Sequence, residues 1–372
     1  MADTPATAGT TGQKPIFIVG PMGSGTTLLR LIVDSHDNIA IAQETSIMRA
    51  YLAHRWIPFH RHGGDWYPRL GWSDDELDER MREFYAGMFE RFAAEHGKKR
   101  WGDKTPWHAW HIREISRVFP DAVILATVRH PGAVAASVSK RFRLGWGGAV
   151  SHWINTTTEL VQRGQEMGDR FLLVRYEDLV LDPETTLREV FSWLDEPWSD
   201  RLLEHHLVHS ERGTPSKVEG ASRSDDPIDP SRISSWTEKV SDEDTAVMRK
   251  RVGGLAAFYG YDLDDVDTFT PMTAAGSPRK KTLTGDDLAT RRAEFPELVE
   301  LDKVNTPWVG NQMLTPEAIG IVAPKKEKAE KKAAKKAAPA AAARPTTTAA
   351  RARRAVGRTM RTVAGKVDPA GR

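Results

Sequence analysis

Short apolar runs alternate with amphipathic segments over the first half of the chain. The apolar runs are rich in β-branched residues and stop at glycine or polar residues, which is typical of strands covered on both faces. They occupy residues 16–19, 39–42, 122–128 and 172–176, and residues 99–104 are interpreted as a further short strand that ends in polar residues. Segments with helical spacing follow at 26–33, 48–56, 73–92, 106–120, 133–142 and 184–194. This alternation predicts an α/β fold, in which helices flank a central parallel sheet in three layers.

The pattern weakens toward the C-terminus. Residues 213–235 are polar and indicate a long loop, and residues 242–259 form one more amphipathic helix. Beyond 265 only residues 286–301 show periodicity, and the last stretch is biased toward Lys, Ala, Pro, Arg and Thr, as in disordered segments. The predicted organisation is a flexible N-terminus (1–13), a main domain (14–265), a C-terminal extension (266–324) and a basic disordered tail (325–372).

One predicted helix, over residues 73–92, carries many large apolar side chains. Ser73-Asp74-Asp75-Glu76 has the form of a capping box and predicts its start. The apolar positions expected in the core are Leu77, Met81, Phe84, Met88, Phe89 and Phe92. Upstream, residues 54–72 mix glycine, proline and aromatic side chains. These aromatics either line a pocket or simply pack.

Composition limits the class of protein. The chain has 372 residues, 40% of them hydrophobic, which suffices for one large or two modest domains. No apolar run approaches the ~20 residues that span a bilayer, and residues 1–13 lack the basic start and apolar core of a signal peptide. There is no cysteine, so disulfides and thiolate metal sites are excluded. We expect a cytoplasmic protein without a transmembrane segment.

The distribution of charged residues and histidines bears on possible partners and on metal binding. The net charge is +2, but residues 325–372 hold 15 Lys and Arg against three acidic residues, so an acidic body carries a basic tail. Such a tail either contacts nucleic acid or an anionic membrane, or acts as a solubilising extension. The 12 histidines show no metal-ligand spacing, and His205 and His206 are expected on a helix surface. No metal is predicted.

The segment from Ile16 to Val33 reads as a strand, a glycine-rich loop and a helix. Backbone N–H groups of such a loop and of the following helix end can surround a phosphate. Compared with the pattern G-x-x-x-x-G-K-[ST], Gly20, Gly25 and Thr27 fit, whereas Thr26 stands in the lysine position. A P-loop-like fold with a ligand other than a magnesium-bound triphosphate is therefore expected; a tight turn without ligand is the alternative.

Polar residues follow other predicted strands. Glu44 comes after residues 39–42, Lys104 ends the run 99–104, and Arg129 follows residues 122–128. Because ligands of parallel sheets bind at the carboxyl ends of strands, these side chains are expected to meet there. Each of these residues also has an interpretation without a ligand. Glu44 would then be a carboxylate at a helix N-terminus, Lys104 an exposed lysine on a loop, and Arg129 a member of a surface ion pair.

Four segments together resemble the sulfotransferases that use 3′-phosphoadenosine 5′-phosphosulfate (PAPS). They are Gly23-Ser24-Gly25-Thr26-Thr27-Leu28-Leu29, Gln43-Glu44-Thr45, Asp103-Lys104-Thr105-Pro106, and Val128-Arg129-His130-Pro131 followed by Ser137. Residues 173–179 and Ile233-Ser234-Ser235-Trp236 also look similar, especially to the tyrosylprotein branch and its bacterial relatives. The resemblance covers residues 15–265. It implies a sulfuryl transfer to a hydroxyl acceptor by in-line displacement.

The resemblance also implies roles for individual residues. Glu44 is the expected general base, and Lys104 is expected to stabilise charge on the leaving phosphate oxygen. Three groups are expected to bind the donor: Gly23, Ser24, Gly25, Thr26 and Thr27 at the 5′ end, Arg129 and Ser137 at the 3′-phosphate, and Tyr176, Ser222 and Arg223 as further contacts, with Arg232 as another candidate. The expected product is adenosine 3′,5′-bisphosphate (PAP), and no metal takes part.

One position departs from the family pattern. Sulfotransferases usually carry Lys or Arg immediately before the Ser-Gly-Thr-Thr run, whereas this chain has Gly23. We expect Lys104 to supply the positive charge beside the bridging oxygen of the donor instead. Two other classes stay open: a nucleotide or small-molecule kinase, disfavoured by Thr26, and a non-catalytic nucleotide-binding protein, favoured by Gly23. The acceptor is a carbohydrate, a lipid, a small molecule or a peptide tyrosine.

Overall fold

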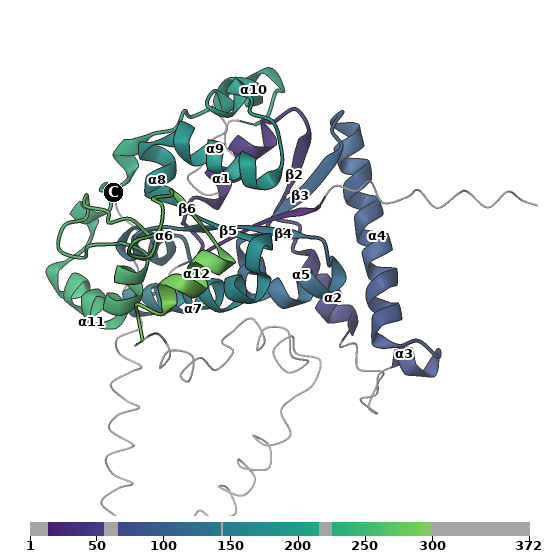
Figure 1. Cartoon of the computed structure of the whole chain (residues 1–372), viewed down its shortest axis with the longest axis horizontal. Coiled ribbons are helices and arrows are strands. Elements are labelled where there is room, and N and C mark those ends of the chain that lie inside the picture. The colour runs from purple at the N-terminus through teal and green to yellow at the C-terminus, as the bar shows by residue number, and fades with distance from the viewer. Residues whose placement is uncertain (1–13, 56–65, 143, 216–224, 297, 299–372) are drawn as a thin grey trace, which may run out of the picture. The chain divides into compact units, whose positions relative to one another are not determined.

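A computed structural model describes residues 14–55, 66–142, 144–215, 225–296 and 298. Its centre is a six-stranded sheet in the order β2-β3-β1-β4-β5-β6 (Figure 1). The strands are β1 (Ile16–Val19), β2 (Ile39–Gln43), β3 (Arg100–Lys104), β4 (Val123–Val128), β5 (Phe171–Arg175) and β6 (Thr282–Thr284). The first five are parallel and β6 is antiparallel to β5. The predicted α/β class is confirmed.

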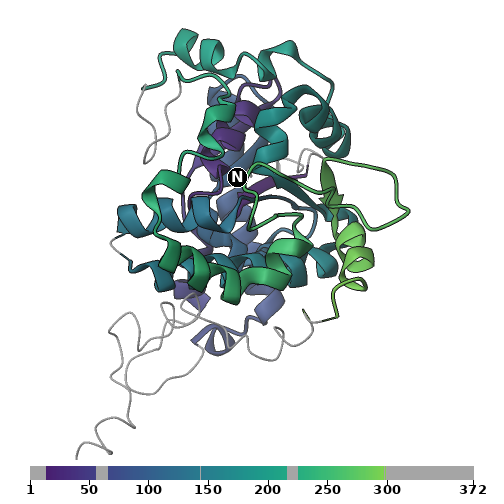
Figure 2. The same ribbon diagram turned by 90° about the vertical axis from the view of Figure 1, so that its left-hand side faces the viewer.

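Helices cover both faces of the sheet (Figures 1 and 2). Ile16 and Ile18 of β1 face a core layer shared with α1 and α9, whereas Phe17 and Val19 face the layer of α2, α4, α5, α6, α7, α11 and α12. The helices are α1 (Thr26–Asp34), α2 (Ile47–Arg55), α3 (Trp66–Arg69), α4 (Asp74–Glu95), α5 (Ile112–Val118), α6 (Pro131–Phe142), α7 (Trp146–Met167), α8 (Tyr176–Leu181), α9 (Pro183–Leu194), α10 (His205–Glu211), α11 (Asp242–Phe258) and α12 (Gly285–Arg292).

The strand register brings the expected site residues to one edge. Gln43 pairs with Lys104, Val19 with Ala126, and Val128 with Arg175, so these strands end side by side. Gly20, Glu44 and Arg129 are the residues that follow β1, β2 and β4. Their placement at the carboxyl edge, as expected from the apolar runs, follows from the parallel pairing.

Some local predictions were wrong. The helix predicted over 106–120 is divided into a 3₁₀ turn (Pro106–Trp110) and α5, because His111 leaves helical geometry at φ −125° and ψ 22°. Phe84 and Met88 are 63% and 50% exposed, since α4 buries a single stripe through Leu77, Tyr85, Phe89 and Ala93. His205 is fully buried rather than on a helix surface.

The chain adds an edge strand that the sequence pattern did not predict. Residues 282–284 form β6, and the Glu189 carboxylate accepts hydrogen bonds from the backbone N–H groups of Lys281 and Thr282 (3.0 and 2.9 Å). Gly285 then brings α12 against α7, where an added Cβ would lie 2.0 Å from the Gly164 carbonyl oxygen. This part of the expected extension therefore packs on the sheet. The domain boundaries stay a prediction.

Part of the prediction falls outside the described residues. The predictions that the structure does not describe concern the N-terminus, the aromatic residues between 56 and 65, Ser222, Arg223 and the basic tail. Within the described ranges, no helix combines the length and the apolar character required to cross a membrane.

Candidate active site

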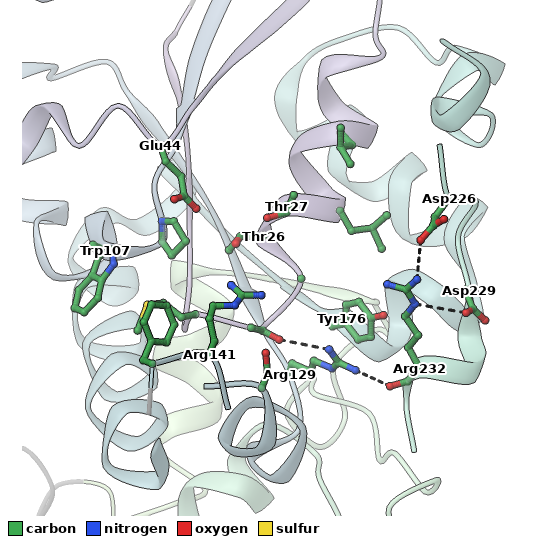
Figure 3. A pocket seen from close by; sticks show the side chains of 18 of the residues that line it. Thr26, Thr27, Glu44, Trp107, Arg129, Arg141, Tyr176, Asp226, Asp229 and Arg232 are labelled. Atoms are coloured by element: carbon green, nitrogen blue, oxygen red, sulfur yellow. Dashed lines mark hydrogen bonds and ion pairs between the residues drawn. The ribbon is translucent and has the colours of Figure 1, made fainter. Parts of the chain in front are cut away.

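A cavity of about 410 Å³ opens at the carboxyl edge of the sheet (Figure 3). Glu44 and Trp107 lie at one end, Thr26 and Thr27 in the middle, and Arg232 at the other end. The remaining lining residues are Met22, Gly23, Gly25, Leu28, Leu31, Pro106, Arg129, Ser137, Arg141, Phe142, Tyr176, Asp226, Pro227 and Asp229. The cavity thus joins residues from six separate stretches of the chain.

The glycine-rich loop is held in a tight conformation. Gly23 and Gly25 have φ of +87° and +93°, and a Cβ on Gly25 would lie 2.4 Å from the Tyr176 ring. The backbone N–H of Met22 donates to His152 Nε2 (3.0 Å). The Ser24 and Thr127 hydroxyls are 2.6 Å apart, which ties the loop to the end of β4. Ser24 is therefore engaged in the loop's own anchoring, and it does not line the cavity.

Helix α1 starts directly at this loop. Gly25 precedes its first residue in a left-handed conformation and, as a glycine, offers no capping side chain. Thr26 and Thr27, the first two residues of the nine-residue helix, line the cavity. The N–H groups of a first helical turn and the positive end of the helix dipole favour an anion at such a place. We call the segment from Gly23 to Thr27 the cradle.

A second group of residues lies toward the other end of the cavity. Arg129 donates to the carbonyl oxygens of Gly23 (3.4 Å) and Arg232 (2.6 Å), and its guanidinium lies 4.2 Å from the centre of the Tyr176 ring. Its buried Nε has no hydrogen-bond partner among the described residues. Ser137 of α6 also lines the cavity. We call Arg129 and Ser137 the clamp.

A buried hydrogen-bond network around Glu177 holds the residue that follows Arg129 of the clamp. Glu177, fully buried, accepts hydrogen bonds from the His130 backbone N–H (2.9 Å) and from the Tyr261 hydroxyl (3.0 Å). Burial raises the pKa of the Glu177 carboxyl, and burial lowers the pKa of the His130 imidazole to about 4. The residue after Arg129 is thereby fixed to the first turn of α8.

The two predicted catalytic residues are direct neighbours. Lys104, fully buried, donates through Nζ to Glu44 Oε1 (2.8 Å) and to Thr27 Oγ1 (3.3 Å). The Glu44 side chain is 47% exposed. Lys104 therefore links the carboxylate of Glu44 to the first turn of α1, and the carboxylate can reach a molecule in the cavity.

Sequence reasoning missed several lining residues. Arg141 stands four residues after Ser137 on α6, and its guanidinium points toward the threonines of the cradle in Figure 3. The i, i+4 spacing from Ser137 was the available signal. Two aromatic side chains, Trp107 and Phe142, also line the cavity, and Phe142 is 44% exposed. By contrast, Tyr67 and Trp72 of the predicted aromatic stretch do not line the cavity.

Comparison with known proteins decides the family. The sequence model of the sulfotransferase family matches residues 15–200. The chain belongs to this family. It is 28% identical over 267 residues to protein-tyrosine sulfotransferase 1 of Danio rerio, which covers 66% of this chain and 72% of that protein. It is 29% identical over 265 residues to protein-tyrosine sulfotransferase 2 of Gallus gallus, with 66% and 69% covered.

Solved structures were also matched. The sulfotransferase domain from the curacin biosynthetic pathway is 18% identical, with a TM-score of 0.45, and the match covers 65% of this chain and 98% of that domain. The family confirms the resemblance to sulfotransferases related to the tyrosylprotein branch, and the assignment of the chain as an enzyme of sulfuryl transfer. The kinase alternative finds no better support. The roles of the individual site residues stay predictions.

Proposed function

We propose that this sulfotransferase moves the sulfuryl group of PAPS to a hydroxyl acceptor. The observation that carries the proposal is one cavity lined by two groups of residues that suit an anion. The cradle offers the start of α1 and two hydroxyls, and the clamp offers the Arg129 guanidinium, whose buried Nε has no hydrogen-bond partner among the described residues and whose Nη1 donates to the Gly23 carbonyl oxygen of the cradle. PAPS has two anionic ends, so these residues fit it.

The residues divide the binding task by their chemistry. The cradle would hold the 5′ end, with Thr26, Thr27 and the N–H groups of α1 as donors. Arg129 and Ser137 would hold the 3′-phosphate, and Arg141 adds a second guanidinium along the same wall. Tyr176 packs against both Gly25 and Arg129, and so keeps the cradle and the clamp at a fixed separation.

The catalytic roles follow from the Glu44–Lys104 pair. When bound, the donor supplies a sulfuryl group whose sulfur bonds to the acceptor oxygen as its bond to the 5′-phosphate oxygen breaks. Glu44 takes the proton of the acceptor hydroxyl, a role worth typically ~10²–10⁴-fold in rate. Lys104 orients Glu44, and its ammonium lies beside the cradle where negative charge develops on the leaving oxygen.

The acceptor side favours an aromatic hydroxyl. Trp107 lies at the Glu44 end of the cavity, and Pro106 and Phe142 also line the cavity (Figure 3). A phenolic proton, with a pKa of about 10, is also easier for a carboxylate to remove than the proton of an aliphatic alcohol. Peptide tyrosine, the acceptor in the names of the relatives, is therefore the first acceptor to test, ahead of carbohydrates, lipids and other small molecules.

Two variants test the proposal. Arg129→Ala should lose PAP binding in calorimetry, and unchanged affinity would refute the clamp. Glu44→Ala should bind PAP with wild-type affinity yet transfer labelled sulfate from PAPS to a tyrosine peptide or to 4-nitrophenol at least ~100-fold more slowly. Retained turnover in this variant would remove Glu44 as the base. The matched control is Glu196→Gln at the opposite edge of the sheet, where Glu196 pairs with Arg100.

A further inference from the structure

The segment that carries Glu44 has an unusual backbone. Glu44 and Ser46 have φ of +40° and +56°, and they are two of the three non-glycine residues with positive φ in the described part of the chain. Side chains with a Cβ rarely adopt this left-handed region, and such strain persists only where the surroundings hold it. Because the strain flanks the proposed base, the residues that hold this turn bear on its position.

Three consecutive N–H groups of the turn are held by the end of β3 and the residues after it. The N–H of Glu44 donates to the Lys104 carbonyl oxygen (2.8 Å). The N–H of Thr45 donates to Asp103 Oδ1 (3.2 Å), and the N–H of Ser46 donates to Thr105 Oγ1 (3.3 Å). The middle bond is the one to an ionised acceptor, which is the stronger kind.

Asp103 also lies against a histidine that contacts the helix following the turn. Its side chain is fully buried, and its other oxygen, Oδ2, lies 3.0 Å from His108 Nδ1. His108 is 1% exposed, and its Nε2 accepts a hydrogen bond from the N–H of Met48 in the first turn of α2 (3.5 Å). The Oδ2–Nδ1 contact does not have hydrogen-bond geometry, so the bond from the Thr45 N–H to Oδ1 is the one by which the Asp103 carboxylate holds the strained turn.

We propose that Asp103 is a positioning residue for Glu44. Its carboxylate keeps the turn from 44 to 46 in the left-handed conformation, and this conformation directs the Glu44 carboxylate to Lys104 Nζ and to the acceptor end of the cavity. Without the charge and the acceptor oxygen of Asp103, the turn relaxes and Glu44 leaves its place. The inference rests on the proposed function only in taking Glu44 as the base.

Three variants of the full chain separate positioning from folding. Asp103→Leu removes both oxygens at similar volume, whereas Asp103→Asn keeps one acceptor for the Thr45 N–H. Glu196→Met is the matched control, because Glu196 is another buried carboxylate, but it pairs with Arg100 at the start of β3, away from the cavity. For each variant we would measure the melting temperature, PAP affinity, kcat and KM with PAPS and a tyrosine peptide, and a crystal structure.

Positioning predicts a specific combination of results. Asp103→Leu should lower kcat by ~10–100-fold with PAP affinity within about twofold of wild type, Asp103→Asn should recover part of the loss, and Glu196→Met should leave kcat unchanged. In the Asp103→Leu crystal structure, the Glu44 carboxylate should no longer contact Lys104 Nζ. An unmoved Glu44 would overturn the inference, and so would a kcat within about twofold of wild type.

The same experiment keeps the inference distinct from the proposed function. If the wild-type protein transfers sulfate to no acceptor, the proposed function fails, whereas the crystal structures still show whether Asp103 holds the turn. If Asp103→Leu loses PAP affinity and kcat in equal proportion, Asp103 supports the sheet as a whole and the positioning role is rejected.

Discussion

Gly23 of the cradle and Ser137 of the clamp are in immediate contact. A Cβ built on Gly23 would lie 2.9 Å from Ser137 Oγ and 3.0 Å from Ser137 Cβ, and the φ of +87° adds backbone strain for any other residue. The position where related enzymes carry Lys or Arg is therefore closed by α6 in this chain. Two other cationic side chains lie near the cavity: Lys104 donates to Thr27 of the cradle, and Arg141 on α6 lines the cavity.

Restoring the family's lysine should weaken the site. Gly23→Lys requires a shift of Ser137 or α6 and a left-handed lysine, so we expect PAP affinity to fall by ~10-fold and the melting temperature to drop. Calorimetry and thermal unfolding measure both quantities. Tighter PAP binding together with faster transfer would show instead that the cradle lacks a charge that it can accommodate.

The contact between Gly25 and Tyr176 gives a second prediction. A methyl group on Gly25 would lie 2.4 Å from Tyr176 Cδ2, so Gly25→Ala should destabilise the fold by about 1–3 kcal/mol and reduce PAP affinity. Denaturant unfolding gives the free energy. Gly87→Ala on α4 is the control: nothing lies within 4 Å of its added Cβ, and this variant should be neutral or slightly more stable. Equal effects of both variants would contradict the packing argument.

The sequence predicted the residues whose position depends on local pattern. Apolar runs indicated four of the parallel strands and a short polar segment the fifth, and because such strands end at one edge, Glu44, Lys104 and Arg129 were expected near the cradle, where the structure places them. Arg141 was missed because its role depends on which face α6 turns to the cavity. The strand β6 has only three residues and is fixed by Glu189 of a distant helix, so no local pattern reveals it.

Other features arise only from tertiary contacts. The strained turn at Glu44 and Ser46 depends on N–H donations to Lys104, Asp103 and Thr105, and nothing in the local composition indicates positive φ there. Ser24 belongs to the family's phosphosulfate motif, yet its hydroxyl lies against Thr127. The sequence identifies such a residue as part of the loop, but not the direction of its side chain.

The carboxylates near Arg232 should lower the affinity of the cavity for anions. Asp226 and Asp229 line the cavity and lie 2.7 and 3.5 Å from the Arg232 guanidinium. Asp226→Asn with Asp229→Asn keeps the hydrogen-bond acceptors but removes two negative charges, so PAP should bind ~3–10-fold more tightly at low salt and less so at high salt. Calorimetry at two ionic strengths measures this.

The control for that experiment removes one negative charge away from the cavity. Asp264→Asn removes a negative charge at an exposed residue that pairs with Arg249, and Asp264 does not line the cavity. PAP affinity should stay within about twofold of wild type in this variant. Weaker binding in the double variant would mean that Asp226 and Asp229 hold Arg232 in the orientation that the donor requires.

His152 should make the cradle sensitive to acid. Its Nε2 accepts the N–H of Met22, so it must be unprotonated, and burial lowers its pKa from 6.5 to about 4. Below pH 6.5 the unfolded chain binds the proton and the folded chain does not, so stability is fully present above about pH 6.5 and is lost as the pH falls through about 4. Burial depresses the pKa of His130 as well, and that histidine acts in the same direction.

A single substitution isolates the contribution of His152. Glutamine at this position keeps an oxygen that can accept the Met22 N–H but does not titrate. Thermal unfolding between pH 4 and pH 8 should show a shallower loss of stability toward acid for His152→Gln than for wild type, with a difference of about 3 kcal/mol at the most acidic point. PAP affinity of the wild type should fall over the same range while the variant retains more of it. Parallel stability profiles would show that the pKa of His152 is the same in the folded and the unfolded chain, which would contradict this prediction.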